Sequence, residues 1–316
     1  MYSRHGYATA MFLAAIALAI GTTGPTAARA DGAFSGERAM VLLEMQCEMG
    51  PRQPGSAGHR ALQDAIEAHA DSLGLRFTRL CFDQTDPWGG DTLSLCNLVI
   101  SCAGGDGPPL WLGAHYDTRP GCDMEDDPEL AARPLIGAND GASGVAVLLH
   151  LAELLAAAPP PRPVSLIFFD GEDSGRPGET LSYCLGSQHL AAHWEDFGSP
   201  LAGPRPEGLI VIDMVGERGL EIPYEPLSLR AAGPWLEAMF RRAAELGLTA
   251  FRPEPGRPVF DDHMPFVQRG LRAVDLIDFD FPQWHTVGDV PAVCDPRSLE
   301  QVGRLLADIV HRPLEP

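Results

Sequence analysis

This chain of 316 residues has few basic residues, no closely spaced pair of cysteines and few long apolar runs. Lysine and arginine together number 23 against 43 aspartates and glutamates, and the formal net charge of -20 would repel a phosphate backbone. We therefore expect no nucleic-acid partner, and interpret the charge as that of a soluble protein whose copies repel one another. The seven cysteines include no Cys-x-x-Cys pair, which argues against a structural zinc ribbon.

One apolar run could be a targeting segment. It lies in residues 1–30, which have the pattern of a secretory signal peptide. A weakly basic start precedes an apolar run over 8–20, and Ala28-Arg29-Ala30 fits a small-x-small cleavage site. The run is short for a membrane span, which needs about 20 residues. We expect export to the periplasm or secretion, a mature chain that begins near Asp31, and no stable membrane insertion after cleavage. An oxidising compartment permits disulfides, but the odd number of cysteines leaves at least one outside any pair within the chain.

Short apolar runs alternate with helical patterns through the rest of the chain. Runs typical of buried strands lie at 110–114, 164–169, 209–212 and 273–277, and further strands are predicted at 75–81 and 96–102. Helical spacing is found at 35–47, 58–74, 142–157, 234–246 and 298–310, the last with Ser298 as a plausible N-cap. This alternation predicts an α/β fold with a mostly parallel sheet and helices on both faces. No repeat or long linker divides it, so residues 31–316 are predicted to form a single domain.

Four segments each end an apolar run with a residue that binds hard metal ions. They are Gly-Ala-Asn-Asp (137–140), Phe-Phe-Asp-Gly-Glu-Asp (168–173), Val-Ile-Asp-Met (211–214) and Gln-Trp-His-Thr (283–286). A fifth segment, Gly-Ala-His-Tyr-Asp (113–117), has the same form. Residues that follow strands of a parallel sheet gather beyond its carboxyl edge. Because carboxylates and imidazoles are ligands that Zn²⁺ accepts, the sequence predicts a metal site at that edge.

Each of these residues also has an ordinary structural explanation. Asp140 precedes a helix and could be its N-cap. The Glu172–Asp173 pair could be a solvated acidic turn, whereas at a strand end one carboxylate could bind metal while its neighbour serves as general acid and base. His115 and Asp213 adjoin buried strands and could be partners of a ligand instead of ligands themselves.

Two polar segments near the end of the chain have similar alternatives. His285, next to Trp284, is either a surface residue or a metal ligand beside a pocket wall. Asp261-Asp262-His263 has the composition of an exposed turn, but the Met-Pro-Phe that follows suggests that the segment folds back against the core. No single residue establishes a metal site, but the candidate residues taken together favour metal binding.

Together these motifs resemble the zinc aminopeptidase/glutaminyl cyclase superfamily over roughly residues 35–312. The resemblance is carried by His115-Tyr116-Asp117, Asn139-Asp140, Asp170-Gly171-Glu172-Asp173, Ile212-Asp213-Met214, Asp261-Asp262-His263-x-Pro-Phe and Trp284-His285-Thr286, with a further similar stretch at 185–190. For the cyclase branch it implies one zinc on Asp140, Asp173 and His285. The implied acid network is Glu172, Asp213 and Asp261. For the aminopeptidase branch it implies a second zinc that also uses His115 and Asp213.

Two residues favour the cyclase branch, and within it the bacterial, animal-type glutaminyl cyclases. Asp261 is a carboxylate where aminopeptidases usually have a small hydroxyl residue, and Trp284 directly precedes the ligand His285. Two positions depart from that pattern. Asp173 stands where animal cyclases have Glu, and the second pocket tryptophan is missing from 174–182, so that Tyr183 is the candidate to replace it. The loop 174–181 is therefore where substrate preference is least defined.

The resemblance implies cyclisation of an N-terminal glutamine of a peptide or protein to pyroglutamate, with loss of ammonia. In this interpretation Glu172 carries the proton from the α-amine to the leaving group, Asp261 and Asp213 support it, and Trp284 walls the pocket. The alternative is a dinuclear aminopeptidase in which Glu172 activates a metal-bound water. A catalytically silent metal-stabilised module is the third hypothesis, and the complete residue set argues against it.

Overall fold

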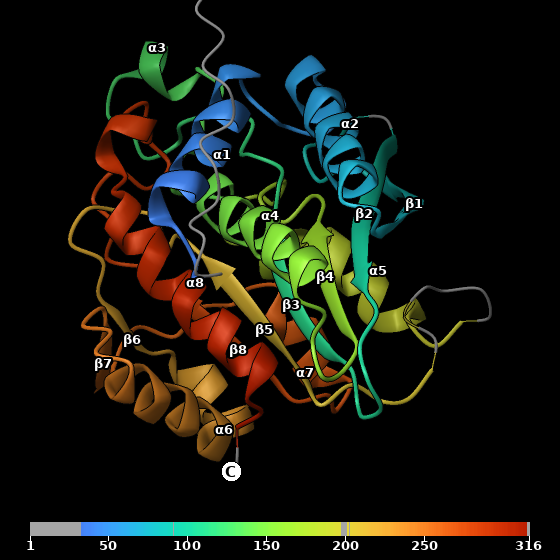
Figure 1. The fold of residues 1–316 in the computed structure, drawn as a ribbon. Coiled ribbons are helices and arrows are strands. Elements are labelled where there is room, and N and C mark those ends of the chain that lie inside the picture. The colour runs from blue at the N-terminus through green and yellow to red at the C-terminus, as the bar shows by residue number, and fades with distance from the viewer. Residues whose placement is uncertain (1–32, 91, 197–200, 202, 315–316) are drawn as a thin grey trace, which may run out of the picture.

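A central sheet of six strands organises the computed structural model, which describes residues 33–90, 92–196, 201 and 203–314. The strand order is β1 (Arg76–Thr85), β2 (Thr92–Cys102), β4 (Val164–Phe169), β3 (Leu110–His115), β5 (Gly208–Asp213) and β8 (Ala273–Ile277) (Figure 1). Strands β4, β3, β5 and β8 run parallel, whereas β1 and β2 pair antiparallel. The predicted, mostly parallel sheet is therefore confirmed. The proposed signal peptide, residues 1–30, lies outside the described residues.

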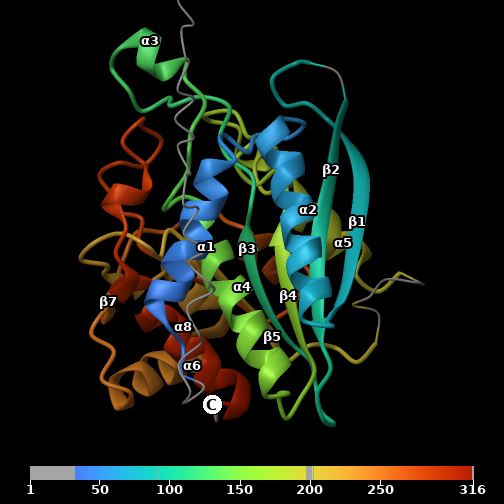
Figure 2. The same ribbon diagram turned by 45° about the horizontal axis from the view of Figure 1, so that its top comes forward.

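Helices cover both faces of this sheet (Figures 1 and 2). The larger core contains α1 (Gly36–Glu48), α2 (Ala57–Ser72), α4 (Ala142–Ala157), α6 (Pro226–Glu245) and α8 (Pro296–His311). On the opposite face α5 (Leu185–His193) and α7 (His263–Gln268) form a smaller core. Alternate residues of one strand serve the two cores: Leu112 faces the first and Trp111 the second.

The smaller elements connect this framework. They are α3 (Pro128–Ala131), the 3₁₀ turns η1 (Thr180–Ser182) and η2 (Pro291–Val293), and a two-stranded sheet of β6 (Ile222–Tyr224) and β7 (Phe251–Pro255). No helix in the described part of the chain is long and apolar enough to cross a bilayer.

Several boundaries differ from the sequence-based expectation, each for a local reason. The N-cap of α8 is Asp295, whose side chain accepts from the amide of Arg297. The prediction of Ser298 as N-cap is therefore wrong, since its hydroxyl instead donates to the carbonyl of Glu217. Helix α6 begins at Pro226, well before the predicted 234, because the carboxylate of Glu225 caps it, and a kink at Ala232 separates its two parts.

The first two strands are longer than predicted and form a hairpin. Cys81 and Cys96 lie opposite one another in its register and are joined by a disulfide. The other described cysteines, Cys47, Cys102, Cys122, Cys184 and Cys294, are free. The pairing could not be read from the sequence, because it depends on the register of the two strands.

Candidate active site

Three predicted ligands meet beyond the carboxyl edge of the sheet. Atoms of Asp140, Asp173 and His285 that can bind a metal lie within 4.8 Å of one another, and all three residues are buried. Nε2 of His285 is 3.5 Å from Asp140 Oδ2 and 3.3 Å from Asp173 Oδ1. The second oxygen of Asp173 is buried without a hydrogen-bond partner. Two buried carboxylates beside an imidazole, with one oxygen unpaired, fit a Zn²⁺ ion.

The alternative explanations for these residues do not hold. Gly141, not Asp140, occupies the N-cap position of α4, where its φ of 87° suits glycine. A Cβ at Gly141 would lie 3.0 Å from the His115 ring, so the close approach of the backbone also requires glycine there. Asp173 and His285 are buried and do not belong to a solvated turn or an exposed surface loop.

Backbone and side-chain contacts fix the orientation of the three candidates. The amides of Asn139 and Asp140 donate to the carboxylate of Asp289 at 2.7 and 3.1 Å. The amide of Asp173 donates to Asp117 at 3.2 Å. Nδ1 of His285 lies 2.9 Å from Asp123, a contact that selects the tautomer with Nε2 free for a metal.

Left-handed backbone is concentrated at this site. Among the described residues, positive φ outside glycine is found at Cys184 (55°), Met214 (47°) and His285 (54°). Cys184 contacts Glu172, Met214 follows Asp213, and His285 is a candidate ligand. Such conformations cost free energy and are retained where the surroundings hold them, as at functional sites.

A second group of candidate ligands adjoins the first and shares Asp140. Nε2 of His115 lies 3.2 Å from Asp140 and 3.1 Å from Asp213, and all three residues are buried. Burial alone would lower the pKa of His115, but the neighbouring carboxylates, Asp213 foremost, raise it well above the ordinary value. Its Nδ1 has no hydrogen-bond partner. The group can therefore hold either a second cation or a protonated imidazole between carboxylates.

Glu172 lies at the edge of the cavity, with its side chain 14% exposed. One of its oxygens accepts from the thiol of Cys184 at 3.4 Å, and Asp261 lies in the same cluster, with the three ligand atoms within 4.8 Å of one another. Burial raises the pKa of Glu172 well above its usual range; His115 opposes the rise and Asp261 adds to it. Burial and the charge of Asp213 likewise raise the pKa of Asp261. Asp261 is buried, so the exposed-turn explanation for it is wrong.

The cavity over these residues has a volume of about 260 Å³, and all the predicted site residues except His115 line it. Trp284 forms one wall, stacked on the His285 ring with centroids 3.9 Å apart and planes inclined by 26°. Tyr183 lines the cavity as well. The remaining lining residues include Asp140, Glu172, Asp173, Asp213, Asp261, Ile277 and Phe279.

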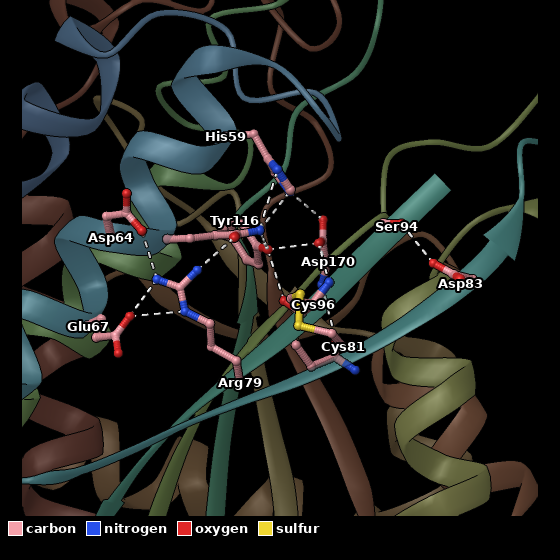
Figure 3. Close-up of a disulfide and its surroundings, with 12 residues drawn as sticks. His59, Asp64, Glu67, Arg79, Cys81, Asp83, Ser94, Cys96, Tyr116 and Asp170 are labelled. Atoms are coloured by element: carbon pink, nitrogen blue, oxygen red, sulfur yellow. Dashed lines mark hydrogen bonds and ion pairs between the residues drawn. A yellow bond between two sulfur atoms is a disulfide. The ribbon is translucent and has the colours of Figure 1, made fainter. Parts of the chain in front are cut away.

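Asp170, two residues before Glu172, is held by contacts with α2, β2 and the residue after β3 (Figure 3). Its buried carboxylate accepts from Nε2 of His59 at 2.8 Å, from the hydroxyl of Tyr116 at 2.8 Å and from the amide of Cys96 at 2.7 Å. The disulfide-linked hairpin is thereby joined to a position two residues before Glu172. Glu172 therefore follows a residue that hydrogen bonds hold in place.

Several residues of the site were not given a role in the sequence analysis. Asp117, Arg119, Asp123, Cys184 and Asp289 all contact a candidate ligand, its backbone or Glu172. Their signal is tertiary, since each lies in an irregular segment where no periodicity marks it. Only Asp117 stood within a quoted motif, directly after His115-Tyr116.

Comparison with known proteins agrees with this geometry. Residues 97–310 match the model of peptidase family M28. Over 283 residues the chain is 28% identical to a glutaminyl-peptide cyclotransferase-like protein of Mus musculus, covering 81% of this chain and 70% of that protein. Among solved structures, Porphyromonas gingivalis glutaminyl cyclase is 32% identical, with a TM-score of 0.80 and coverage of 87% of this chain and 96% of that one.

A third relative, described as a Zn-dependent exopeptidase from Parabacteroides distasonis, is 30% identical with a TM-score of 0.83; the match covers 89% of this chain and 99% of that one. The matched residues include every candidate ligand described above. The chain belongs to peptidase family M28, and within that family it is similar to the bacterial glutaminyl cyclases.

Proposed function

We propose that the protein is a zinc-dependent glutaminyl-peptide cyclotransferase, which converts the N-terminal glutamine of a peptide or protein to pyroglutamate and releases ammonia. The observation that carries this proposal is the pairing of two acids, the partly exposed Glu172 and the buried Asp261, directly beside the candidate zinc ligands. Similarity to proteins named glutaminyl cyclase and glutaminyl-peptide cyclotransferase supports it.

The residues present suit a single zinc held by Asp140, Asp173 and His285, which would act as a Lewis acid toward the γ-amide carbonyl of the substrate. The second group, His115 with Asp213, then has no metal. Its imidazole instead hydrogen-bonds to Asp213 through Nε2, which also lies 3.2 Å from the carboxylate of Asp140.

The reaction is an intramolecular acyl transfer in which Glu172 moves one proton. The α-amine nitrogen bonds to the γ-carbonyl carbon while Glu172 accepts a proton from that nitrogen. The bond from the same carbon to the amide nitrogen then breaks, and Glu172 returns the proton to the departing ammonia. No water is consumed, so the products are pyroglutamate and ammonia alone.

A carboxylate that must both accept and return a proton functions best with a pKa near the working pH. Burial and the neighbouring acids raise the pKa of Glu172 in that direction. We assign Asp261 and Asp213 to support of Glu172, because the negative charge of Asp261 raises the pKa of Glu172 and Asp213 in turn raises that of Asp261. Trp284 and Tyr183 are assigned to the walls that hold the glutamine side chain.

The alternative is a dinuclear aminopeptidase, favoured by one observation: His115, Asp140 and Asp213 could hold a second cation next to the first. Incubation with a Gln-initiated and a Leu-initiated peptide separates the two by mass spectrometry. We expect loss of ammonia from the first peptide and no change in the second. Release of free leucine without pyroglutamate formation would replace the cyclase with the peptidase.

We further propose that the protein is exported to the periplasm or secreted after cleavage near Asp31. The proposal depends on the pattern of residues 1–30 described above. N-terminal sequencing of the protein recovered from the extracytoplasmic fraction would test it, with an intact Met1 in the cytoplasm as the contrary result.

A further inference from the structure

Arg119 lies at the centre of the site, although no motif in the sequence marks it. It follows β3 by four residues and is fully buried beside the cavity. Its NH1 donates to Asp173 Oδ1 at 3.2 Å, and its NH2 donates to Asp123 Oδ2 at 2.5 Å. One guanidinium thus joins two carboxylates from different segments of the chain.

These two contacts fix two of the three proposed zinc ligands. Arg119 holds Oδ1 of Asp173, the oxygen that lies 3.3 Å from Nε2 of His285, while the other oxygen of Asp173 has no hydrogen-bond partner. Asp123 uses one oxygen for Arg119 and the other for Nδ1 of His285, at 2.9 Å. The chain from Arg119 through Asp123 to His285 therefore leaves Nε2 as the metal-binding nitrogen.

The same guanidinium also holds the wall of the cavity. It donates to the carbonyl of Gly175 at 3.1 Å and to the hydroxyl of Tyr183 at 3.3 Å, and it lies over the Tyr183 ring at 5.5 Å from the centroid. The Tyr183 ring packs so closely on Gly175 that an added Cβ would lie 2.2 Å from it. Tyr183 is thus held between Gly175 and Arg119.

We propose that Arg119 is the positioning residue that sets the zinc ligands and the Tyr183 wall as one unit. Its planar fork allows this, since NH1 and NH2 point at Asp173 and Asp123 at the same time. A lysine at this position would keep the charge but present a single ammonium group, which cannot reproduce the geometry of the fork.

The positioning role and a simple charge role predict different zinc affinities for variants of Arg119. Removing a positive charge near a cation site would by itself strengthen zinc binding. Loss of ligand orientation weakens it, by about 10–100-fold for residues that hold metal ligands. Arg119→Lys keeps the charge and removes the fork, so it tests orientation alone. The zinc affinity of the metal-free protein is measured by competition with a chromogenic chelator, which needs no substrate and so does not depend on the proposed reaction.

We expect Arg119→Lys to bind zinc about 10–100-fold more weakly than the wild type. The matched control is Arg242→Lys, since Arg242 also pairs with two carboxylates, Asp308 and Glu245, but between α6 and α8. This control should keep wild-type affinity. Wild-type affinity in Arg119→Lys would overturn the proposal.

Two further variants keep the test decisive if Arg119→Lys does not fold. Asp123 is 31% exposed, so Asp123→Ala leaves no large cavity, yet it removes the link between Arg119 and His285. We expect a loss of zinc affinity of similar size, and an unchanged affinity would contradict the proposal. Tyr183→Phe removes only the hydroxyl that Arg119 contacts, so it should raise the KM for a Gln peptide and leave zinc affinity unchanged.

Discussion

The thiol of Cys184 donates to one oxygen of Glu172 at 3.4 Å. Cys184 is buried, and burial raises its pKa well above the ordinary value, so the sulfur keeps the proton that it donates. The other oxygen, Oε2, lies 4.0 Å from Nδ1 of His115. Glu172 is therefore held through one oxygen, and the second remains available for proton transfer.

Replacing Glu172 with Gln should reduce turnover sharply without loss of zinc. The amide oxygen of Gln can still accept from Cys184, so the fold should be retained, but the group cannot carry a proton. We expect a fall in kcat of about 10²–10⁴-fold, measured on a Gln-initiated peptide alongside zinc content by metal analysis. If Glu172→Gln lost the metal and Asp173→Asn kept it, the roles of the two neighbours would be reversed.

Asp261→Ser tests the residue on which the choice between cyclase and aminopeptidase depends in this proposal. In a cyclase the change removes the acid beside Glu172, so cyclisation should fall sharply while zinc content and the melting temperature change little. A peptidase should tolerate serine at this position. Wild-type cyclisation by Asp261→Ser would show that Asp261 has no part in proton transfer.

A separate pair of acids predicts a dependence of stability on pH. Burial, followed by the contact with Asp278, raises the pKa of Glu217 to about 8. Because the folded state binds this proton more tightly than the unfolded state, the stabilisation is complete below the unfolded pKa. It is lost as the pH rises toward and through about 8.

The measurement is the free energy of unfolding of the wild type and of Glu217→Gln at pH values below and above about 8. The wild type should lose stability as the pH increases from about 5 to about 9, and the variant should lose less, because Gln does not titrate. Parallel curves for the two proteins would contradict the assignment of this titration to Glu217.

Chelation should remove activity, and added zinc should restore it, because the proposed reaction depends on zinc as the Lewis acid that polarises the γ-amide carbonyl. Metal analysis of the active protein should give one zinc per chain. Two zincs per chain would place a metal on His115 and Asp213 and favour the peptidase. Full activity without metal would contradict the site itself.

The sequence predicted the elements whose signal is local. The apolar runs that became β3, β4, β5 and β8 were recognised because a buried parallel strand reads as a continuous hydrophobic stretch. The rule that residues after such strands gather at one edge of the sheet marked Asp173 as a site residue, whereas the ligand set Asp140, Asp173 and His285 was implied by the resemblance to the zinc aminopeptidase/glutaminyl cyclase superfamily.

What the sequence did not provide depends on contacts between distant segments. Arg119 and Asp123 acquire their roles only when Asp173 and His285, more than fifty residues away, fold against them. The N-cap of α8 is a local example. Asp295 and Ser298 are both good N-cap residues, but the hydroxyl of Ser298 donates to the carbonyl of Glu217, a distant residue, and Asp295 caps the helix.

The central claim is that the α-amine of the substrate, and not water, attacks the carbonyl. Reaction of a Gln-initiated peptide in oxygen-18-labelled water tests this most directly. The account predicts a product that has lost ammonia and carries no label, with Glu172→Gln forming none of it. Label in a hydrolysed product, with no pyroglutamyl peptide, would contradict the account.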